Sequence, residues 1–188
     1  FDARVSALRM LAEELTNQQI AGDCAEVGVY RGDFAAGISR ELPERTLHLF
    51  DTFAGFPAED LEREQALGLI HRGRNDFSDT DIGTVRAKLA SPERAVFHAG
   101  YFPETFAGCE GLRFALVSLD ADLYAPTAAA LPLFWERLTP GGVILIHDCA
   151  GMQYPGVSRA VSGFCAAHGL YTVPLSDLHG TVVLRKQQ

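Results

Sequence analysis

Short apolar runs without polar alternation recur along the chain, and a polar residue, usually an acid, follows most of them. The runs cover residues 24–29, 46–50, 95–98, 114–119 and 142–146. Strands that are buried on both faces have this pattern, which is typical of a parallel sheet covered by helices. A closing pair of strands is expected over residues 170–174 and 179–185, joined by a short turn.

Helical spacing of apolar residues alternates with these strands. It predicts helices over residues 3–16, 33–42, 79–90, 125–138 and 156–168. Alternation of strand and helix indicates an α/β fold with a doubly wound, mostly parallel sheet of seven strands, which is a Rossmann-like architecture. In such sheets ligands bind at the carboxyl ends of the strands.

A length of 188 residues fits one domain spanning 1–188. Residues 52–78 form a long connection directly after the second strand, and we expect a lid or mobile loop there. His71 and the run Arg72-Gly73-Arg74 within it are interpreted as a solvated loop rather than an anion site.

Charge and cysteine usage exclude several classes of protein. The 24 acidic against 16 basic residues give a net charge of -8, which disfavours binding to nucleic acid or to an anionic membrane. No apolar run reaches a transmembrane length. The four cysteines form neither a CxxC pair nor a disulfide framework, so a reducing, cytoplasmic location is expected. His48 and His98, which lie within expected strands, are interpreted as packing residues rather than metal ligands.

The first strand ends in Glu26-x-Gly28-x-x-x-Gly32. This spacing lacks the Gly-x-Gly-x-x-Gly turn of dinucleotide-binding proteins, because Tyr30 and Arg31 occupy its place. Asp51, at the end of the second strand, can accept hydrogen bonds from ribose hydroxyls. Together these features favour a nucleoside-containing cofactor, with a nicotinamide-dependent oxidoreductase as the weaker alternative.

Four blocks carry a resemblance to a known family. They are Ala25-Glu26-Val27-Gly28-Val29-Tyr30-Arg31-Gly32, Leu49-Phe50-Asp51-Thr52-Phe53-Ala54-Gly55-Phe56-Pro57, Leu119-Asp120-Ala121-Asp122-Leu123-Tyr124 and Pro140-Gly141-Gly142-Val143-Ile144. In this order they resemble the macrocin O-methyltransferase (TylF) family. These class I S-adenosylmethionine-dependent enzymes methylate sugar hydroxyls of natural products.

The resemblance implies a site for S-adenosyl-L-methionine across the first two strands. The implied cofactor-binding residues are Glu26, Gly28, Tyr30, Arg31, Gly32, Asp51, Thr52, Phe53, Gly100, Tyr101 and Asp120. The amino-acid end of the cofactor is expected near Glu26 and Gly28, the ribose at Asp51, and the adenine near Gly100 and Tyr101.

The resemblance also implies a divalent metal, usually Mg²⁺, at Asp120, His147 and Asp148, with Asp122 as the general base. The family has two adjacent acids where this chain has His147-Asp148. Mg²⁺ prefers oxygen ligands and imidazole suits other metals better. Three alternatives stay open: a different metal, a different task for His147 such as base or hydrogen-bond donor, or no metal.

The expected activity is therefore metal-assisted O-methylation of a sugar hydroxyl on a natural product or a sugar nucleotide. The expected acceptor is a small, glycosylated molecule. The oligomeric state stays open, and the apolar, helix-rich surface is compatible with a homodimer. A catalytically inactive module that keeps the methyltransferase-like fold is the other alternative.

Overall fold

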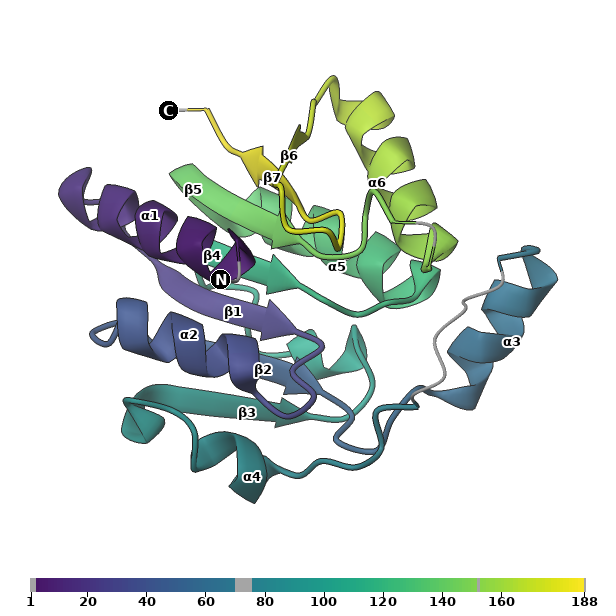
Figure 1. The fold of residues 1–188 in the computed structure, drawn as a ribbon, viewed down its shortest axis with the longest axis horizontal. Helices are drawn as coiled ribbons and strands as arrows, with labels where there is room; N and C mark the ends of the chain where they lie inside the picture. Colours follow the sequence, from purple (N-terminus) through teal and green to yellow (C-terminus); the bar gives the residue numbers. More distant parts are fainter. Residues whose placement is uncertain (1–2, 70–75, 152, 188) are drawn as a thin grey trace.

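The buried runs form one sheet of seven strands in a computed structural model that describes residues 3–69, 76–151 and 153–187 (Figure 1). The strands are β1 (Asp23–Val27), β2 (Leu47–Asp51), β3 (Ala95–Ala99), β4 (Phe114–Leu119), β5 (Leu138–Ile146), β6 (Val173–Pro174) and β7 (Val182–Arg185). Their order is β3-β2-β1-β4-β5-β7-β6. The first five pair in parallel and β7 is antiparallel to β5 and β6, so the predicted fold class is confirmed.

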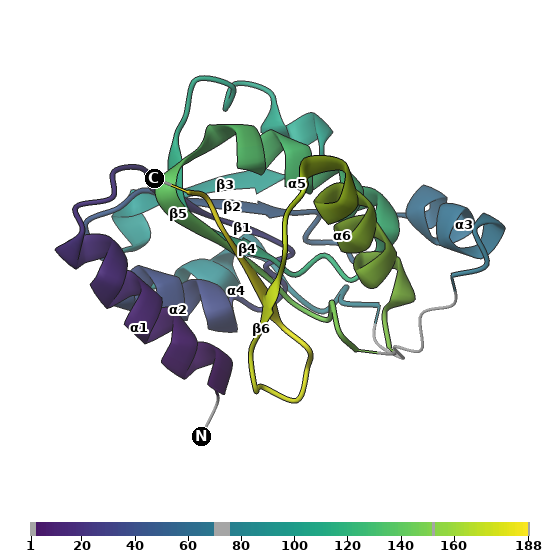
Figure 2. The same ribbon diagram turned by 90° about the horizontal axis from the view of Figure 1, so that it is seen from above.

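Helices cover both faces of the sheet (Figure 2). On one face lie α1 (Ala3–Asn17), α2 (Asp33–Glu41) and α4 (Ile82–Arg86), and on the other lie α5 (Tyr124–Arg137) and α6 (Pro155–His168). The central strands β1 and β4 are buried on both faces, which explains why their sequences lack polar alternation. An ion pair between Lys88 and Asp33, 2.6 Å apart, ties the segment after α4 to the start of α2.

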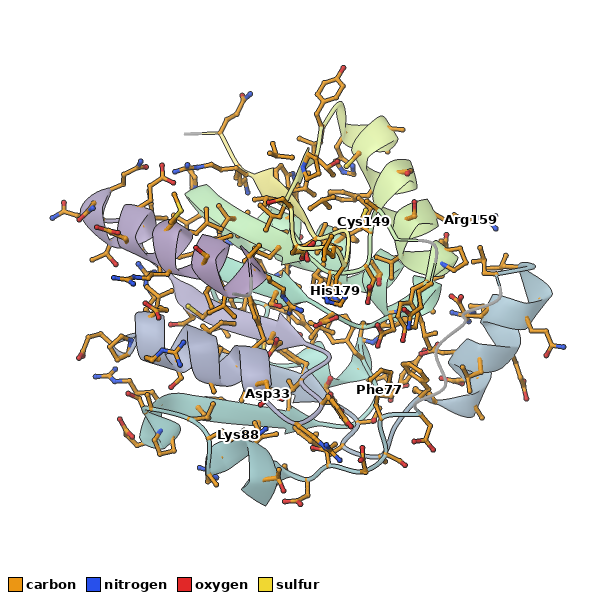
Figure 3. All side chains as sticks on the ribbon, viewed as in Figure 1. Asp33, Phe77, Lys88, Cys149, Arg159 and His179 are labelled. Atoms are coloured by element: carbon orange, nitrogen blue, oxygen red, sulfur yellow. The ribbon has the colours of Figure 1, made fainter. Side chains whose placement is uncertain are left out.

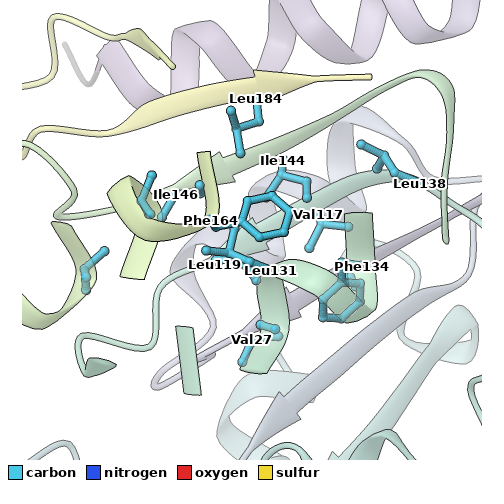
Figure 4. Close-up of a cluster of buried hydrophobic side chains, with 14 of the residues drawn as sticks. Val27, Val117, Leu119, Leu131, Phe134, Leu138, Ile144, Ile146, Phe164 and Leu184 are labelled. Atoms are coloured by element: carbon cyan, nitrogen blue, oxygen red, sulfur yellow. The ribbon is translucent and has the colours of Figure 1, made fainter. Parts of the chain in front are cut away.

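Two apolar cores result, one on each face of the sheet. Figure 4 shows part of the larger core, in which Leu131 and Phe134 of α5 and Phe164 of α6 pack against the strands. Val27 and Val117 contribute from β1 and β4. This packing fixes the carboxyl ends of β1, β2, β4 and β5 at one edge, where the functional side chains emerge.

Two local predictions differ from the structure. The helix expected over 79–90 is only the five-residue α4, because the Asp81 carboxylate accepts a hydrogen bond from the amide of Thr84 and starts the helix there. The connection over 52–78 contains a helix, α3 (Ala58–Ala66), preceded by Pro57 and with Glu59 and Asp60 in its first turn. His71 and the run Arg72-Gly73-Arg74 lie outside the described residues. Figure 1 shows α3 beyond the carboxyl ends of the strands.

Within the described ranges, no helix combines the length and the apolar character needed to cross a membrane.

Candidate active site

A cavity of about 480 Å³ opens at the carboxyl ends of β1, β2, β4 and β5. Most of the residues predicted for the site line it: Glu26, Gly28, Tyr30, Arg31, Asp51, Thr52, Gly100, Tyr101, Asp120, Asp122, His147 and Asp148. Two predicted residues, Gly32 and Phe53, are not part of the lining. The volume lies within the usual range for small-molecule sites.

Gly28 allows the backbone of β1 to approach the end of β4. Its φ is +83°, and a Cβ at this position would lie 2.0 Å from the carbonyl oxygen of Asp120. Gly32 has a different role, because a Cβ there would meet the side chain of Val85 at 2.7 Å. Gly28 therefore shapes the cavity floor, whereas Gly32 lets α2 pack against α4.

Asp51 organises the loops at the ends of β1 and β2. Its Oδ2 accepts hydrogen bonds from the backbone amides of Val29 at 2.6 Å and Tyr30 at 2.8 Å, and its Oδ1 accepts one from the amide of Phe53 at 2.7 Å. A carboxylate has about four acceptor positions. One position on Oδ1 is left for a ligand hydroxyl.

Glu26 carries its carboxyl group into the interior beneath Gly28. The residue is 1% exposed, and Ser118 Oγ donates a hydrogen bond to its Oε1 over 3.4 Å. Within the described part of the chain, its Oε2 has no hydrogen-bond partner. Burial is the main cause that raises the pKa of Glu26 to about 8, with Arg4 acting in the opposite direction. A buried carboxyl oxygen without a partner is costly, and a cationic group of a ligand would offset this cost.

Three carboxylates meet at the other end of the cavity. Asp120, Asp122 and Asp148 each offer an oxygen, and these oxygens lie within 4.8 Å of one another. Asp122 and Asp148 have positive φ angles of 61° and 55°, a conformation that costs energy outside glycine and is concentrated at functional sites. Burial and the neighbouring Asp120 and Asp148 raise the pKa of Asp122 well above its usual value.

His147 lies between two of these carboxylates. Its Nδ1 is 2.9 Å from Asp120 Oδ1 and 2.9 Å from Asp148 Oδ2. Burial lowers the pKa of His147, but the two carboxylates outweigh it and raise that pKa to about 10. Burial likewise raises the pKa of Asp120, but Arg4 and His147 outweigh it and hold that pKa at about 2. In this arrangement the imidazole donates to the carboxylates through Nδ1.

Tyr30 and Arg31 both contact Asp79, across the rim of the cavity. The Tyr30 hydroxyl donates to Asp79 Oδ1 at 2.7 Å, and the Arg31 guanidinium pairs with the other oxygen. Asp79 lies in the described segment that begins at residue 76, so these contacts hold the start of this segment beside the first strand. Figure 3 shows Phe77 of this segment and His179 of the β6–β7 turn, which also line the cavity.

Arg4 and Asp60 are among the cavity-lining residues that sequence reasoning did not assign to the site. Arg4 of α1 contacts Asp120 Oδ2 at 2.9 Å and packs over the ring of Phe34. Asp60 of α3 is 2% exposed and accepts a hydrogen bond from the Tyr101 hydroxyl at 2.9 Å. Arg4 follows no motif, and Asp60 is one of several acids on a helix that was not predicted, so the sequence offered no signal for either.

Comparisons with known proteins show which family the chain belongs to. The chain matches the macrocin O-methyltransferase (TylF) family over residues 2–186. It is 27% identical over 179 residues to mycinamicin III 3''-O-methyltransferase of Micromonospora griseorubida, covering 89% of this chain and 69% of that protein. It is 28% identical over 194 residues to an 8-demethyl-8-(2,3-dimethoxy-alpha-L-rhamnosyl)-tetracenomycin-C 4'-O-methyltransferase of Streptomyces olivaceus, covering 96% and 71%.

Solved structures agree on the fold. The O-methyltransferase NovP superposes with a TM-score of 0.78 at 22% identity, covering 99% of this chain and 80% of NovP. The calicheamicin methyltransferase CalS11 gives a TM-score of 0.76 at 21% identity, covering 97% and 78%. The chain therefore belongs to the macrocin O-methyltransferase family and is an S-adenosylmethionine-dependent O-methyltransferase with the class I fold.

Proposed function

We propose that this enzyme methylates a hydroxyl group on the sugar of a glycosylated natural product or of a sugar nucleotide. The observation that carries the proposal is the cluster of Asp120, Asp122 and Asp148, which faces the same cavity as the cofactor residues Glu26 and Asp51. The names of two relatives support a sugar acceptor, since one is a mycinamicin III 3''-O-methyltransferase and the other a 4'-O-methyltransferase of a rhamnosyl tetracenomycin.

The residues present fit S-adenosylmethionine. The Oε2 of Glu26, which has no hydrogen-bond partner among the described residues, suits the ammonium of its amino-acid end. Gly28 lets the ends of β1 and β4 approach each other and so shapes the floor on which that end would lie. The free acceptor position of Asp51 suits a ribose hydroxyl. When bound, the cofactor supplies a methyl group on a positively charged sulfur.

Asp122 is the proposed general base. The Asp122 carboxylate would accept the proton of the acceptor hydroxyl as that oxygen is methylated. A base is most effective when its pKa approaches the working pH, and the surroundings of Asp122 shift its pKa in that direction. Asp120, held ionised by Arg4 and His147, provides a fixed negative charge beside it.

The carboxylates of Asp120, Asp122 and Asp148 also fit a divalent cation. Oxygen ligands suit Mg²⁺ and Mn²⁺, and such an ion would acidify the acceptor hydroxyl. His147 was predicted as a ligand from the resemblance. Its Nδ1 faces Asp120 and Asp148 as a hydrogen-bond donor, and His147 also forms a candidate metal-holding group with Asp148 and His179, whose ligand atoms lie within 4.8 Å of one another. We propose that Asp120 and Asp148 would hold the ion, with His147 beside them, and that Asp122 stays uncoordinated as the base.

The described parts of the connection after β2, residues 52–69 and 76–78, are proposed as a lid beside the cavity, with α3 as their helical part. Two buried acids hold this helix in place. Asp60 accepts a hydrogen bond from the Tyr101 hydroxyl, and Oε1 of Glu64 accepts one from the amide of Tyr124 at 2.5 Å. Glu64 thereby satisfies an amide at the start of α5. We expect Asp60→Asn to raise the KM for the acceptor more than it changes kcat.

The test is methyl transfer from isotopically labelled S-adenosylmethionine to a panel of glycosylated macrolides, aminocoumarins and sugar nucleotides. The control for each compound is its aglycone, or an analogue whose sugar lacks the acceptor hydroxyl. We expect label on a sugar oxygen, located by mass spectrometry. Label on the aglycone alone would contradict the sugar assignment. Failure to bind S-adenosylhomocysteine would contradict the cofactor site itself.

A further inference from the structure

A second group of metal-binding side chains lies away from the cavity. We propose that His48 of β2, His98 of β3 and Cys109, in the turn after residues 104–106, form a zinc site. Asp23 at the start of β1 orients one of the ligands. None of these four residues lines the cavity described above.

The distances are close to those of a zinc centre. His48 Nδ1 and His98 Nε2 are 3.0 Å apart, His98 Nε2 and Cys109 Sγ are 3.9 Å apart, and all three atoms lie within 4.8 Å of one another. Tetrahedral zinc with its usual bonds to nitrogen and sulfur places neighbouring ligand atoms about 3.3–3.7 Å apart. Movements of a few tenths of an ångström to about 1 Å would complete the triangle.

The orientation of His48 is the pattern expected of a metal ligand. Its Nε2 is 3.3 Å from Asp23 Oδ2, so the ring can donate its proton there and leave the Nδ1 lone pair directed at His98. Metal-bound histidines usually donate their other ring N–H to a carboxylate in this way. The two imidazole rings have centroids 5.3 Å apart and an interplanar angle of 21°, with His48 Nδ1 facing His98 Nε2. A tilt of both rings would direct these two nitrogens toward one metal ion.

Aromatic side chains surround the two imidazole rings and hold them in position. Phe50 stacks on His98 at 4.2 Å, and the edge of Phe114 meets His48 at 5.8 Å. Burial lowers the pKa of both histidines. Burial also raises the pKa of the Cys109 thiol. Zinc binding must therefore release one proton from Cys109 to solvent, while His98 shifts its proton from Nε2 to Nδ1.

The site would brace one wall of the cavity. His98 and Cys109 stand at the two ends of a segment that contains Gly100 and Tyr101, both cavity-lining residues. An ion held by both ends ties this segment to β2 and β3. His48 and His98 are 50 positions apart, which explains why spacing along the sequence gave no ligand motif and predicted packing roles instead.

The test is a titration of the chelator-stripped full chain with Co²⁺, followed by ultraviolet and visible absorption. We expect a thiolate-to-cobalt charge-transfer band that saturates at one equivalent and disappears when one equivalent of Zn²⁺ is added. Carboxylate ligands at Asp120, Asp122 and Asp148 give no such band, so Asp148→Asn should leave it intact. Because the wild-type titration needs no variant, absence of the band there overturns the proposal directly.

Variants locate the site. Cys109→Ser should abolish the band, whereas Cys165→Ser, which changes another partly shielded free thiol, should keep it. Asp23→Asn should weaken Zn²⁺ binding about 10–100-fold, measured by competition with a chromophoric chelator, as loss of an outer-shell carboxylate does elsewhere. A band that persists in Cys109→Ser, or that is lost in Cys165→Ser, would overturn the assignment.

Discussion

Replacing Glu26 with Gln is expected to weaken the binding of S-adenosylhomocysteine and to remove the pH dependence of that binding. The carboxyl group is buried, its Oε2 has no hydrogen-bond partner among the described residues, and burial raises its pKa to about 8. It is therefore mostly protonated at neutral pH in the free enzyme. Binding of the cofactor ammonium requires the ionised form, so binding must expel this proton.

The magnitude follows from the pKa. Each pH unit below a pKa of about 8 costs about 1.4 kcal/mol to ionise Glu26, which corresponds to a tenfold weaker Kd. The α-amino group of the ligand has a pKa of roughly 7.7–8.0 and stays mainly protonated below about pH 7.5. We therefore expect the Kd of the wild type to fall about tenfold per unit between roughly pH 6 and pH 7.5. Glu26→Gln should bind with a nearly constant Kd, about 10–100-fold weaker than the wild type at the upper end, as expected for a lost charged hydrogen bond.

Isothermal titration calorimetry with S-adenosylhomocysteine measures this directly. Buffers of different ionisation enthalpy should report release of about one proton in the wild type and none in Glu26→Gln. Asp51→Asn is the matched control, since it loses the proposed ribose contact and should keep the slope with pH. A slope that survives unchanged in Glu26→Gln would refute the reasoning, because another group would then supply the proton.

The remaining predictions concern stability, shape and chemistry. Because the pKa of Glu26 in the fold lies above its usual 4.5, the native state binds more protons than the unfolded state, so the free energy of unfolding should fall as pH rises from about 4.5 to about 8. Urea unfolding should show a flatter profile for Glu26→Gln, and equal profiles would contradict the burial of this charge. Gly28→Ala should destabilise the fold by roughly 1–3 kcal/mol more than Gly108→Ala and abolish cofactor binding, since both glycines have positive φ but only Gly28 would clash. Asp122→Asn should lower kcat about 10²–10⁴-fold without changing the Kd for S-adenosylhomocysteine, and an unchanged kcat would remove Asp122 from the role of base.

The strands were predictable because burial on both faces removes polar alternation from the sequence. β1, β2, β4 and β5 coincide with the apolar runs to within a few residues. The helix α3 escaped prediction because its sequence has almost no apolar face, and it is held by the polar contacts of Asp60 and Glu64 instead. Contacts of this kind depend on residues about 40 and 60 positions away, so no local pattern records them.

The site was predictable where the fold itself gathers the residues. Parallel strands bring Glu26, Asp51 and Asp120 to one edge whatever their separation in sequence, and the structure places all three on the cavity. Arg4 could not be foreseen, because its contact with Asp120 depends on how α1 crosses the sheet. The same holds for the ring of His147, whose direction toward Asp120 and Asp148 is set by packing rather than by its position after β5.

Burial of charge explains why this edge can bind a cation. A buried ion costs several kcal/mol unless it is paired, so a fold keeps one only where a partner or a ligand compensates it. Asp120 has Arg4 and His147, and Asp148 has His147. Among the described acids that line the cavity, Glu26 alone keeps a buried oxygen without a hydrogen-bond partner. The cost of burying an unpartnered carboxyl oxygen in the free enzyme therefore falls on Glu26, where a ligand ammonium would offset it. A cofactor analogue without the amino group should lose about as much affinity as the Glu26→Gln variant loses for the intact cofactor.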